Sequence, residues 1–242
     1  GLEKGLGLIE AFDEQHPRMT ATQAAQRTGL TRTAARRYLL TLQHLGYVHS
    51  DGKLYWLAPK VLRLGSAYLE SSRLARVVQP FLQRITAGTQ ESAFLSVLDG
   101  ADQVYIARNG GNRAMNIGFV TGARVPAALA SAGLAILSTW TPEAAQAWVA
   151  AYPLKTFTPH TIASRERLNL EIARARAHGH CVLEQQLELN VRGVAVPLRD
   201  HLGTCVAALS VSMPIAAETT DMAVARVLPA LLETAQGLRN LI

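Results

Sequence analysis

Residues 20–46 constrain the fold of this chain more than any other segment of its 242 residues. Thr20 is placed to cap a short helix, with Gln23 in the position that completes a capping box. Gly29 then supplies a turn, and Thr31 is placed to cap a longer helix that another glycine ends. Two helices joined by a short turn with glycine are typical of a helix-turn-helix, so this segment is predicted to form one.

The longer helix has an apolar side and a basic side. On a wheel of about 3.6 residues per turn, the apolar side chains that we assign to the core are Ala35, Tyr38, Leu39, Leu42 and Leu45. The opposite side carries Thr33, Arg36, Arg37 and His44, with Arg32 at its flank. Arginine can donate two hydrogen bonds to guanine, so this side is predicted to enter the major groove of DNA. A solvated arginine face on an ordinary surface helix is the alternative, and the sequence offers no reason for Leu40 on this side.

A hairpin is predicted after these helices. Residues 47–49 and 54–57 are rich in β-forming side chains and flank Asp51-Gly52, a pair that favours a tight turn. With a first helix predicted at residues 2–15, this arrangement is the winged form of the helix-turn-helix. Lys53 lies at the wing tip, where it would contact phosphate or only increase solubility. The candidate DNA-binding residues are therefore Thr22, Thr31, Arg32, Thr33, Arg36, Arg37 and Lys53.

Positive charge is concentrated near the amino terminus. Residues 1–78 contain 11 lysine and arginine residues against 6 acidic ones, whereas residues 79–242 contain 13 against 12. A basic module joined to a nearly neutral domain is typical of a DNA-binding domain attached to a sensor or an enzyme. We therefore expect a double-stranded DNA operator as a partner.

The composition favours buried cores and no membrane segment. Hydrophobic residues make up 49% of the chain and charged residues 17%, which argues against disorder. Charges interrupt the apolar run at residues 194–213, and the amino terminus lacks a cleavage-site pattern, so we expect neither a membrane span nor a signal peptide. Cys181 and Cys205 are too few for a disulfide framework or a metal site. We expect no metal, no cofactor and a reducing, cytoplasmic setting.

From residue 59 onward the sequence predicts a linker helix and an α+β domain. The linker has an apolar stripe that suits packing against a second subunit or, alternatively, against its own chain. Strands are predicted at residues 92–98, 103–108, 115–119, 123–125, 181–186, 191–197 and 204–213, and helices at 74–85, 128–138, 142–150, 164–177 and 218–242. This order predicts a largely antiparallel sheet flanked by helices. The predicted domains are a winged helix-turn-helix at 1–58, a linker helix at 59–73 and a larger domain at 74–242.

Several segments of the chain are similar to those of one known family. In the first part they are LEKGLGLIEAF and TGLTRTAARRYLLTLQHLGYV; in the larger domain they are VLRLGSAYL, LDGADQVYIAR, VPAALASAGLAIL, RGVAVPLRD and VAALSVSM. They resemble segments of IclR-type transcriptional regulators, and the resemblance covers essentially the whole chain. The sequence of the segment DGKLYWLAPKVLRLGSAYL is most similar to the branch of the family that responds to protocatechuate, p-hydroxybenzoate and related aromatic acids. The resemblance implies an effector-binding larger domain and a homodimer or homotetramer.

The resemblance also implies where a small organic acid would bind. Family ligand sites lie on one side of the effector sheet, and the matching candidates here are Ser131, Ala132, Gly133, Gln186, Arg192, Ser210 and Ser212. Ser131 lies near the start of a predicted helix, where backbone amides favour an anion. Arg192 would donate a charge-assisted bond to a carboxylate or, alternatively, form an ion pair with Glu184 or Glu188. The last two serines share one face of their strand, where they would bind ligand or only pack.

The chain departs from the branch pattern around this expected site. Gln186 and Asn190 stand where relatives have an acid and a glycine. Gly193 replaces a serine, and Leu134 replaces a basic residue. The sequence therefore predicts a ligand-responsive DNA-binding regulator of aromatic acid catabolism, with a non-aromatic carboxylate or a protein partner as the alternative signal. An enzyme is the least favoured possibility, because Ser131 lacks a G-x-S-x-G elbow and no histidine or cysteine has catalytic spacing.

Overall fold

The computed structural model describes residues 1–110, 120–216 and 218–242. The chain divides into two compact units, Gly1–Tyr68 and Leu69–Ile242, and the boundary between them falls within helix α4 (Leu62–Ser71). Each unit has its own hydrophobic core. The finer division into residues 1–58, 59–73 and 74–242 stays a prediction.

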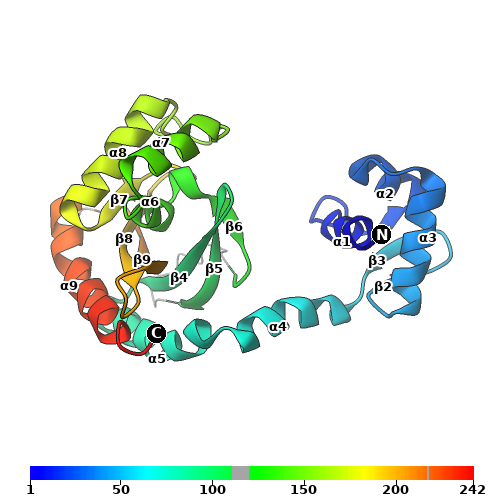
Figure 1. Ribbon diagram of the computed structural model, residues 1–242, viewed down its shortest axis with the longest axis horizontal. Helices are drawn as coiled ribbons and strands as arrows, with labels where there is room; N and C mark the ends of the chain where they lie inside the picture. Colours follow the sequence, from blue (N-terminus) through cyan, green and yellow to red (C-terminus); the bar gives the residue numbers. More distant parts are fainter. Residues whose placement is uncertain (111–119, 217) are drawn as a thin grey trace. The chain divides into compact units, whose positions relative to one another are not determined.

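The N-terminal unit begins with three helices and a small antiparallel sheet, followed by the 3-10 turn η1 (Pro59–Val61) and the first part of α4 (Figure 1). The helices are α1 (Leu2–Glu10), α2 (Ala21–Thr28) and α3 (Arg32–His44), and the strands are β1 (Met19–Thr20), β2 (Val48–Ser50) and β3 (Leu54–Leu57), in the order β1-β3-β2. The predicted capping box is confirmed, because the Thr20 hydroxyl accepts from the Gln23 amide at 3.3 Å and the Gln23 side chain accepts from the Thr20 amide at 2.9 Å. Gly29 adopts a φ of 68°, which ends α2 in the left-handed conformation that glycine tolerates best.

Three features of this unit differ from the sequence expectations. Helix α1 ends at Glu10 rather than near residue 15, and the residues after it form a turn in which Asp13 accepts a hydrogen bond from the His16 amide. Strand β1 was not predicted, because two residues are too short to show a period. Leu45 is 48% exposed instead of buried; it is the C-cap residue of α3, and its amide still donates to the Thr41 carbonyl at 2.9 Å.

The C-terminal unit is built on one six-stranded antiparallel sheet in the order β6-β5-β4-β9-β8-β7. Its strands are β4 (Ser92–Asp99), β5 (Asp102–Asn109), β6 (Arg124–Pro126), β7 (Cys181–Glu184), β8 (Val191–Arg199) and β9 (Cys205–Pro214). Helices α5 (Arg73–Thr89) and α9 (Thr220–Leu238) pack on one face of this sheet, and α6 (Ser131–Leu137), α7 (Pro142–Ala151) and α8 (Arg165–His178) lie on the other (Figure 1). The predicted α+β fold is confirmed.

Alternation along the strands gives the two faces of this sheet different contents. On β9, Leu209 and Val211 belong to the core beneath α5 and α9, whereas Ala208 belongs to the core on the α6 side. On β8, Val194 and Val196 face α5 and α9, and Ala195 faces α6. Each face is therefore a separate packing surface with its own set of side chains.

The predicted helix at residues 128–138 is interrupted at its start. A 3-10 turn, η2 (Ala127–Leu129), and one extended residue, Ala130, precede α6. Gly133 allows this close packing, since a Cβ atom there would lie 2.2 Å from the carbonyl oxygen of Ala127. The strand predicted at residues 115–119 lies outside the described residues.

Candidate functional site

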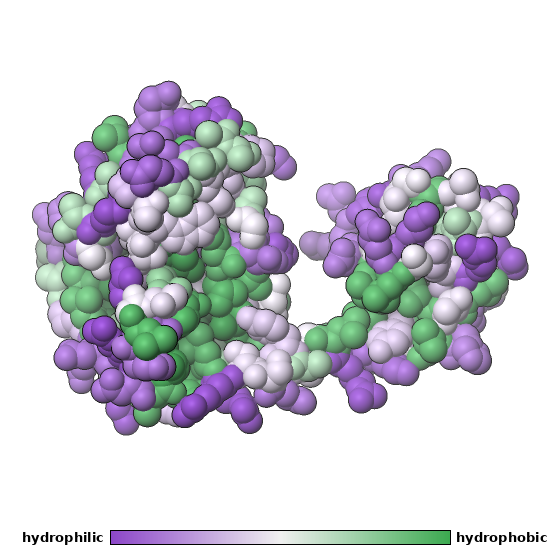
Figure 2. All heavy atoms as spheres, viewed as in Figure 1, coloured by the Kyte–Doolittle hydropathy of each residue, from purple (hydrophilic) through white to green (hydrophobic). Residues whose placement is uncertain are grey.

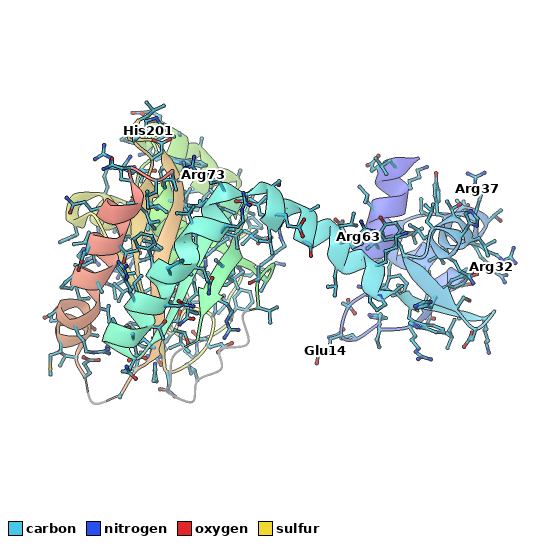
Figure 3. The ribbon with its side chains drawn as sticks, turned by 90° about the horizontal axis from the view of Figure 1, so that it is seen from below. Glu14, Arg32, Arg37, Arg63, Arg73 and His201 are labelled. Atoms are coloured by element: carbon cyan, nitrogen blue, oxygen red, sulfur yellow. The ribbon has the colours of Figure 1, made fainter. Side chains whose placement is uncertain are left out.

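Helix α3 presents its basic side to solvent. The buried Ala35, Leu39 and Leu42 anchor the opposite side in the N-terminal core, and the Thr31 hydroxyl caps the helix by accepting from the Ala34 amide at 3.2 Å. Four exposed residues, Arg32, Thr33, Arg36 and Arg37, line one shallow hollow together with Leu40. Figure 3 shows Arg32 and Arg37 at the edge of the unit, with side chains pointing away from its body. Such a helix can place guanidinium groups against base edges and phosphates.

The other DNA-binding candidates occupy the flanks of this helix. Thr22 is exposed in the first turn of α2, and Thr31 uses its hydroxyl in the cap of α3. Lys53 is exposed in the β2–β3 turn, where the Asp51 carboxylate accepts from the Lys53 amide at 2.9 Å and from the Leu54 amide at 2.8 Å. These two bonds, that from Leu54 first, lower the pKa of Asp51 below its usual value. The turn is therefore held rigidly with its lysine outward.

A cavity opens on the α6 side of the sheet in the C-terminal unit. Its volume is about 60 Å³, which is smaller than the roughly 300 to 1,000 Å³ of a typical ligand pocket. Its walls come from β5, β8, β9, the start of α6 and the β7–β8 loop, and its polar lining includes Gln103, Tyr105, Ser131, Gln186, Ser210 and Ser212. Leu129 and Leu183 add apolar surface. A flat ring with polar substituents suits this mixture of walls.

Hydrogen bonds orient the polar groups of this cavity. Gln103 accepts from the Gly133 amide at 2.9 Å, so that its amide side chain is fixed against α6. Tyr105 is buried, and this burial raises the pKa of its phenol although a hydrogen bond with Gln103 acts in the opposite direction. The phenol is therefore neutral over the physiological pH range, and it can donate or accept.

The β7–β8 loop forms one wall of the cavity and is anchored by Gln186. Its side chain accepts from the Ile162 amide at 2.8 Å and donates to the carbonyls of His160 and Glu184 at 2.9 and 2.8 Å. The Thr161 hydroxyl donates to the Gln186 carbonyl at 2.7 Å. Gln186 therefore lines the cavity while it also fixes the loop.

The structure places Arg192 away from the cavity. Its side chain is almost fully buried and its Nε lies 2.6 Å from Oε1 of Glu184, and its terminal nitrogens also donate to the carbonyls of Glu218 and Thr219. The ion pair with Glu184, the alternative that the sequence left open, is thus the observed arrangement. Arg192 shares the strand face of Val194, whereas Val191 and Gly193 line the cavity. Neighbouring residues of a strand point to opposite faces, which is the physical reason for the difference.

The pKa of Glu184 reflects this pairing. Partial burial raises it, but hydrogen bonds from Thr220 and Arg192 and the charge of Arg192 outweigh that effect, so that the net pKa is lowered. Thr220 donates to the same carboxylate oxygen at 2.7 Å. The pair thereby fastens the end of β7 to the first residues of α9.

Of the remaining ligand-binding candidates, some line the cavity and others do not. Ser131, Ser210 and Ser212 line the cavity, but Ala132 and Gly133 are not among its lining residues. Gln103 and Tyr105 also line the cavity and were not predicted to do so, although both lie in a predicted strand and share one of its faces. Alternation places both on one face of the strand but does not say which face lines the cavity.

The described residues do not favour a metal site, a membrane span or a catalytic cysteine. Across residues 1–110, 120–216 and 218–242, no group of three or more His, Cys, Asp or Glu side chains is arranged to hold a metal ion. Within the same residues, no helix combines the length and apolar character needed to cross a membrane. Cys181 is buried, and burial raises the pKa of its thiol, which is unfavourable for a nucleophile.

Known proteins resemble both units. The model of the IclR helix-turn-helix domain matches residues 1–52, and that of the C-terminal domain of the bacterial transcriptional regulator IclR matches residues 66–240. The p-hydroxybenzoate hydroxylase transcriptional activator of Acinetobacter baylyi is 37% identical over 247 residues, which cover 100% of this chain and 91% of that protein.

Solved structures agree with these matches. The crystal structure of a proposed transcriptional regulator from Rhodococcus sp. RHA1 is 39% identical, with a TM-score of 0.85 over 98% of this chain and 96% of the other. The inducer-binding domain of the Acinetobacter transcription factor PobR, a double mutant in complex with 3-hydroxybenzoic acid, is 31% identical, with a TM-score of 0.66 over 71% of this chain and 100% of that domain.

Proposed function

Because the chain belongs to the IclR family of bacterial transcriptional regulators, we propose that it controls genes for the catabolism of an aromatic hydroxy acid and that this acid is its effector. Members of this family are ligand-responsive DNA-binding regulators and not enzymes. The relative from Acinetobacter baylyi carries p-hydroxybenzoate hydroxylase in its name, and the PobR domain holds 3-hydroxybenzoic acid. Both support a hydroxybenzoate-like effector for this chain.

The observation that carries the proposal is the cavity on the α6 side of the sheet. Leu129, Leu183 and the ring of Tyr105 offer apolar surface to an aromatic ring. The hydroxyl groups of Ser131 and Ser210 can donate hydrogen bonds to a carboxylate. Amide and phenol groups elsewhere in the lining can bond a ring hydroxyl. Arg192 has no part in this proposed site, since its guanidinium is already bonded on the other face of the sheet.

DNA binding is proposed to use the basic side of α3 and the wing. Arg32, Thr33, Arg36 and Arg37 would enter the major groove, with Lys53 on the adjacent phosphates. Thr22 and Thr31, at the starts of α2 and α3, would contact the DNA backbone.

We propose that the regulator acts as a homodimer or homotetramer in the cytoplasm. Leu64 and Tyr68 lie four residues apart on one side of α4 and are 45% and 50% exposed, and hydrophobic residues lie at the surface of this segment (Figure 2). An exposed apolar stripe on a helix suits packing against the same helix of a second copy. A double-stranded operator with two similar half-sites would match such a dimer.

A thermal-shift screen tests the proposed effector. Protocatechuate and p-hydroxybenzoate are expected to raise the melting temperature, because a ligand that binds only the folded state stabilises it, whereas adipate and acetate are expected to have no effect. In Ser131→Ala and Ser210→Ala variants, affinity for the active acid should fall about tenfold each, the loss expected for one hydrogen bond to a charged group. Ser66→Ala, on the exposed surface of α4, is the matched control.

Two results would redirect the proposal. Stabilisation by the aliphatic acids alone would indicate a non-aromatic carboxylate as effector. If no acid stabilised the protein while sequence-specific DNA binding persisted, a protein partner would replace the small molecule as the signal.

A further inference from the structure

An exposed leucine lies in the middle of the basic side of α3. Leu40 is 42% exposed and lines the same shallow hollow as the arginines of this helix. Arg32, Arg36 and Leu40 are spaced four residues apart, so they form one row along the helix surface. Leu40 therefore continues the arginine row by one further turn.

The core of the N-terminal unit does not require this side chain. Leu39 is fully buried and Leu42 nearly so, and these residues already fix the buried side of α3. An exposed leucine in the free protein leaves apolar surface in water, which becomes favourable to bury once a partner covers it. Three arginines and Thr33 make up the rest of the lining, so a partner that covers the hollow needs negative charge beside an apolar group.

The major groove of DNA has this combination of properties. Phosphates flank the groove, and the only apolar group that the base edges present in it is the C5 methyl group of thymine. We propose that Leu40 contacts the methyl group of one thymine in each half-site and so determines the preference for thymine at that position. This inference rests on the proposed role of α3 in DNA binding.

A second exposed leucine of the same segment provides the control. Leu45 is 48% exposed, but it follows the end of α3 and is not among the residues that line the hollow. Leu45→Ala therefore removes a similar apolar side chain without changing the proposed contact. Because both leucines are exposed, neither substitution should prevent folding, and circular dichroism can verify this.

The experiment uses the full chain and DNA that it selects itself. Duplexes are first selected from a random-sequence library with the wild-type protein. Each thymine of the selected duplex is then replaced in turn by deoxyuridine, which lacks only the C5 methyl group, and binding is measured by fluorescence anisotropy. One thymine per half-site is expected at which this replacement weakens wild-type binding about fourfold, the factor that corresponds to one buried methyl group.

The variants make the assignment specific. Leu40→Ala should bind the thymine duplex at least fourfold more weakly and should no longer distinguish thymine from deoxyuridine at that position. Leu45→Ala should retain the wild-type discrimination. The inference is overturned if no thymine methyl group affects wild-type binding, or if Leu40→Ala still distinguishes the two bases. Failure of the wild-type protein to select any sequence would instead refute the proposed DNA-binding face itself, and the inference with it.

Discussion

Replacing Glu184 by glutamine should destabilise the C-terminal unit through the buried arginine that it pairs with. The substitution keeps the size of the side chain and its capacity to accept a hydrogen bond, but it removes the negative charge 2.6 Å from Nε of Arg192. The Arg192 side chain is only 3% exposed, so its charge loses its main counter-ion in a poorly hydrated place. The carbonyls of Glu218 and Thr219 remain as acceptors for Arg192 and reduce the loss of stability.

The size of the effect follows from the burial of the two partners. Breaking a fully buried pair costs about 3 to 5 kcal/mol, and an exposed pair contributes at most about 1 kcal/mol. The Glu184 side chain is 32% exposed, so solvent screens part of the interaction. We expect a loss of about 1 to 2 kcal/mol in the free energy of unfolding. For a unit of this size, that loss corresponds to a melting temperature lower by about 2 to 8 °C.

The assay is a thermal melt of the full chain followed by circular dichroism at several pH values. The folded-state pKa of Glu184 is lowered from the ordinary value of 4.5, so its contribution is fully present above that pH and is lost as the pH falls through the folded-state pKa. The difference between wild type and Glu184→Gln should therefore be largest near pH 7 and should shrink in acid. Glu233→Gln, an exposed carboxylate of α9, is the control and should change little. A difference below about 1 °C at pH 7, or one that is equal at pH 7 and pH 4, would refute this account of the ion pair.

Three further predictions concern the other parts of the molecule. Arg36→Ala should weaken binding to a selected DNA duplex by at least tenfold and lower the salt dependence of binding measured in gel-shift titrations. Arg36→Lys should keep that salt dependence but lose the base preference. Unchanged binding by Arg36→Ala would show that α3 does not contact the DNA. Gly193→Ala should abolish stabilisation by the effector in thermal-shift assays, because its Cβ would lie 2.6 Å from the Ser131 hydroxyl oxygen, and Gly237→Ala, where the nearest atom would be 3.5 Å away, should not. Thr20→Ala should lower the stability of the N-terminal unit by about 1 kcal/mol through loss of the capping box, measured by hydrogen exchange of α2 amides. Thr20→Ser, which keeps a capping hydroxyl, should be nearly neutral. An equal loss in both variants would exclude a capping effect.

Local signals predicted the N-terminal unit well, because caps, turns and helical periodicity act over a few residues. The capping threonines of α2 and α3 and the buried Ala35 and Leu39 lie as the sequence indicates. Leu45 was predicted to be buried but is exposed at the C-cap of α3. Boundaries depend on a few terminal hydrogen bonds that a periodic pattern does not encode.

The ligand cavity was predicted less completely, because it depends on contacts between distant segments. Ser131, Ser210 and Gln186 converge from three places in the chain, and the family resemblance rather than periodicity brought them together. Tyr105 lies in a predicted strand, but the sequence does not say which face of that strand α6 covers. Arg192 shows the opposite case, since alternation alone separates it from the neighbouring Gly193.

The alternation of the central strands has a consequence for engineering a sensor from this scaffold. On β9, Ser210 and Ser212 line the cavity, whereas Leu209 and Val211 hold α5 and α9 against the sheet. A directed-evolution library confined to the cavity-face positions can therefore change which molecule is recognised, while the alternate positions, such as Leu209 and Val211, keep the packing that stabilises the fold. Libraries that randomise consecutive residues of β9 would mix the two tasks, and most of their members would fail to fold before their selectivity could be tested.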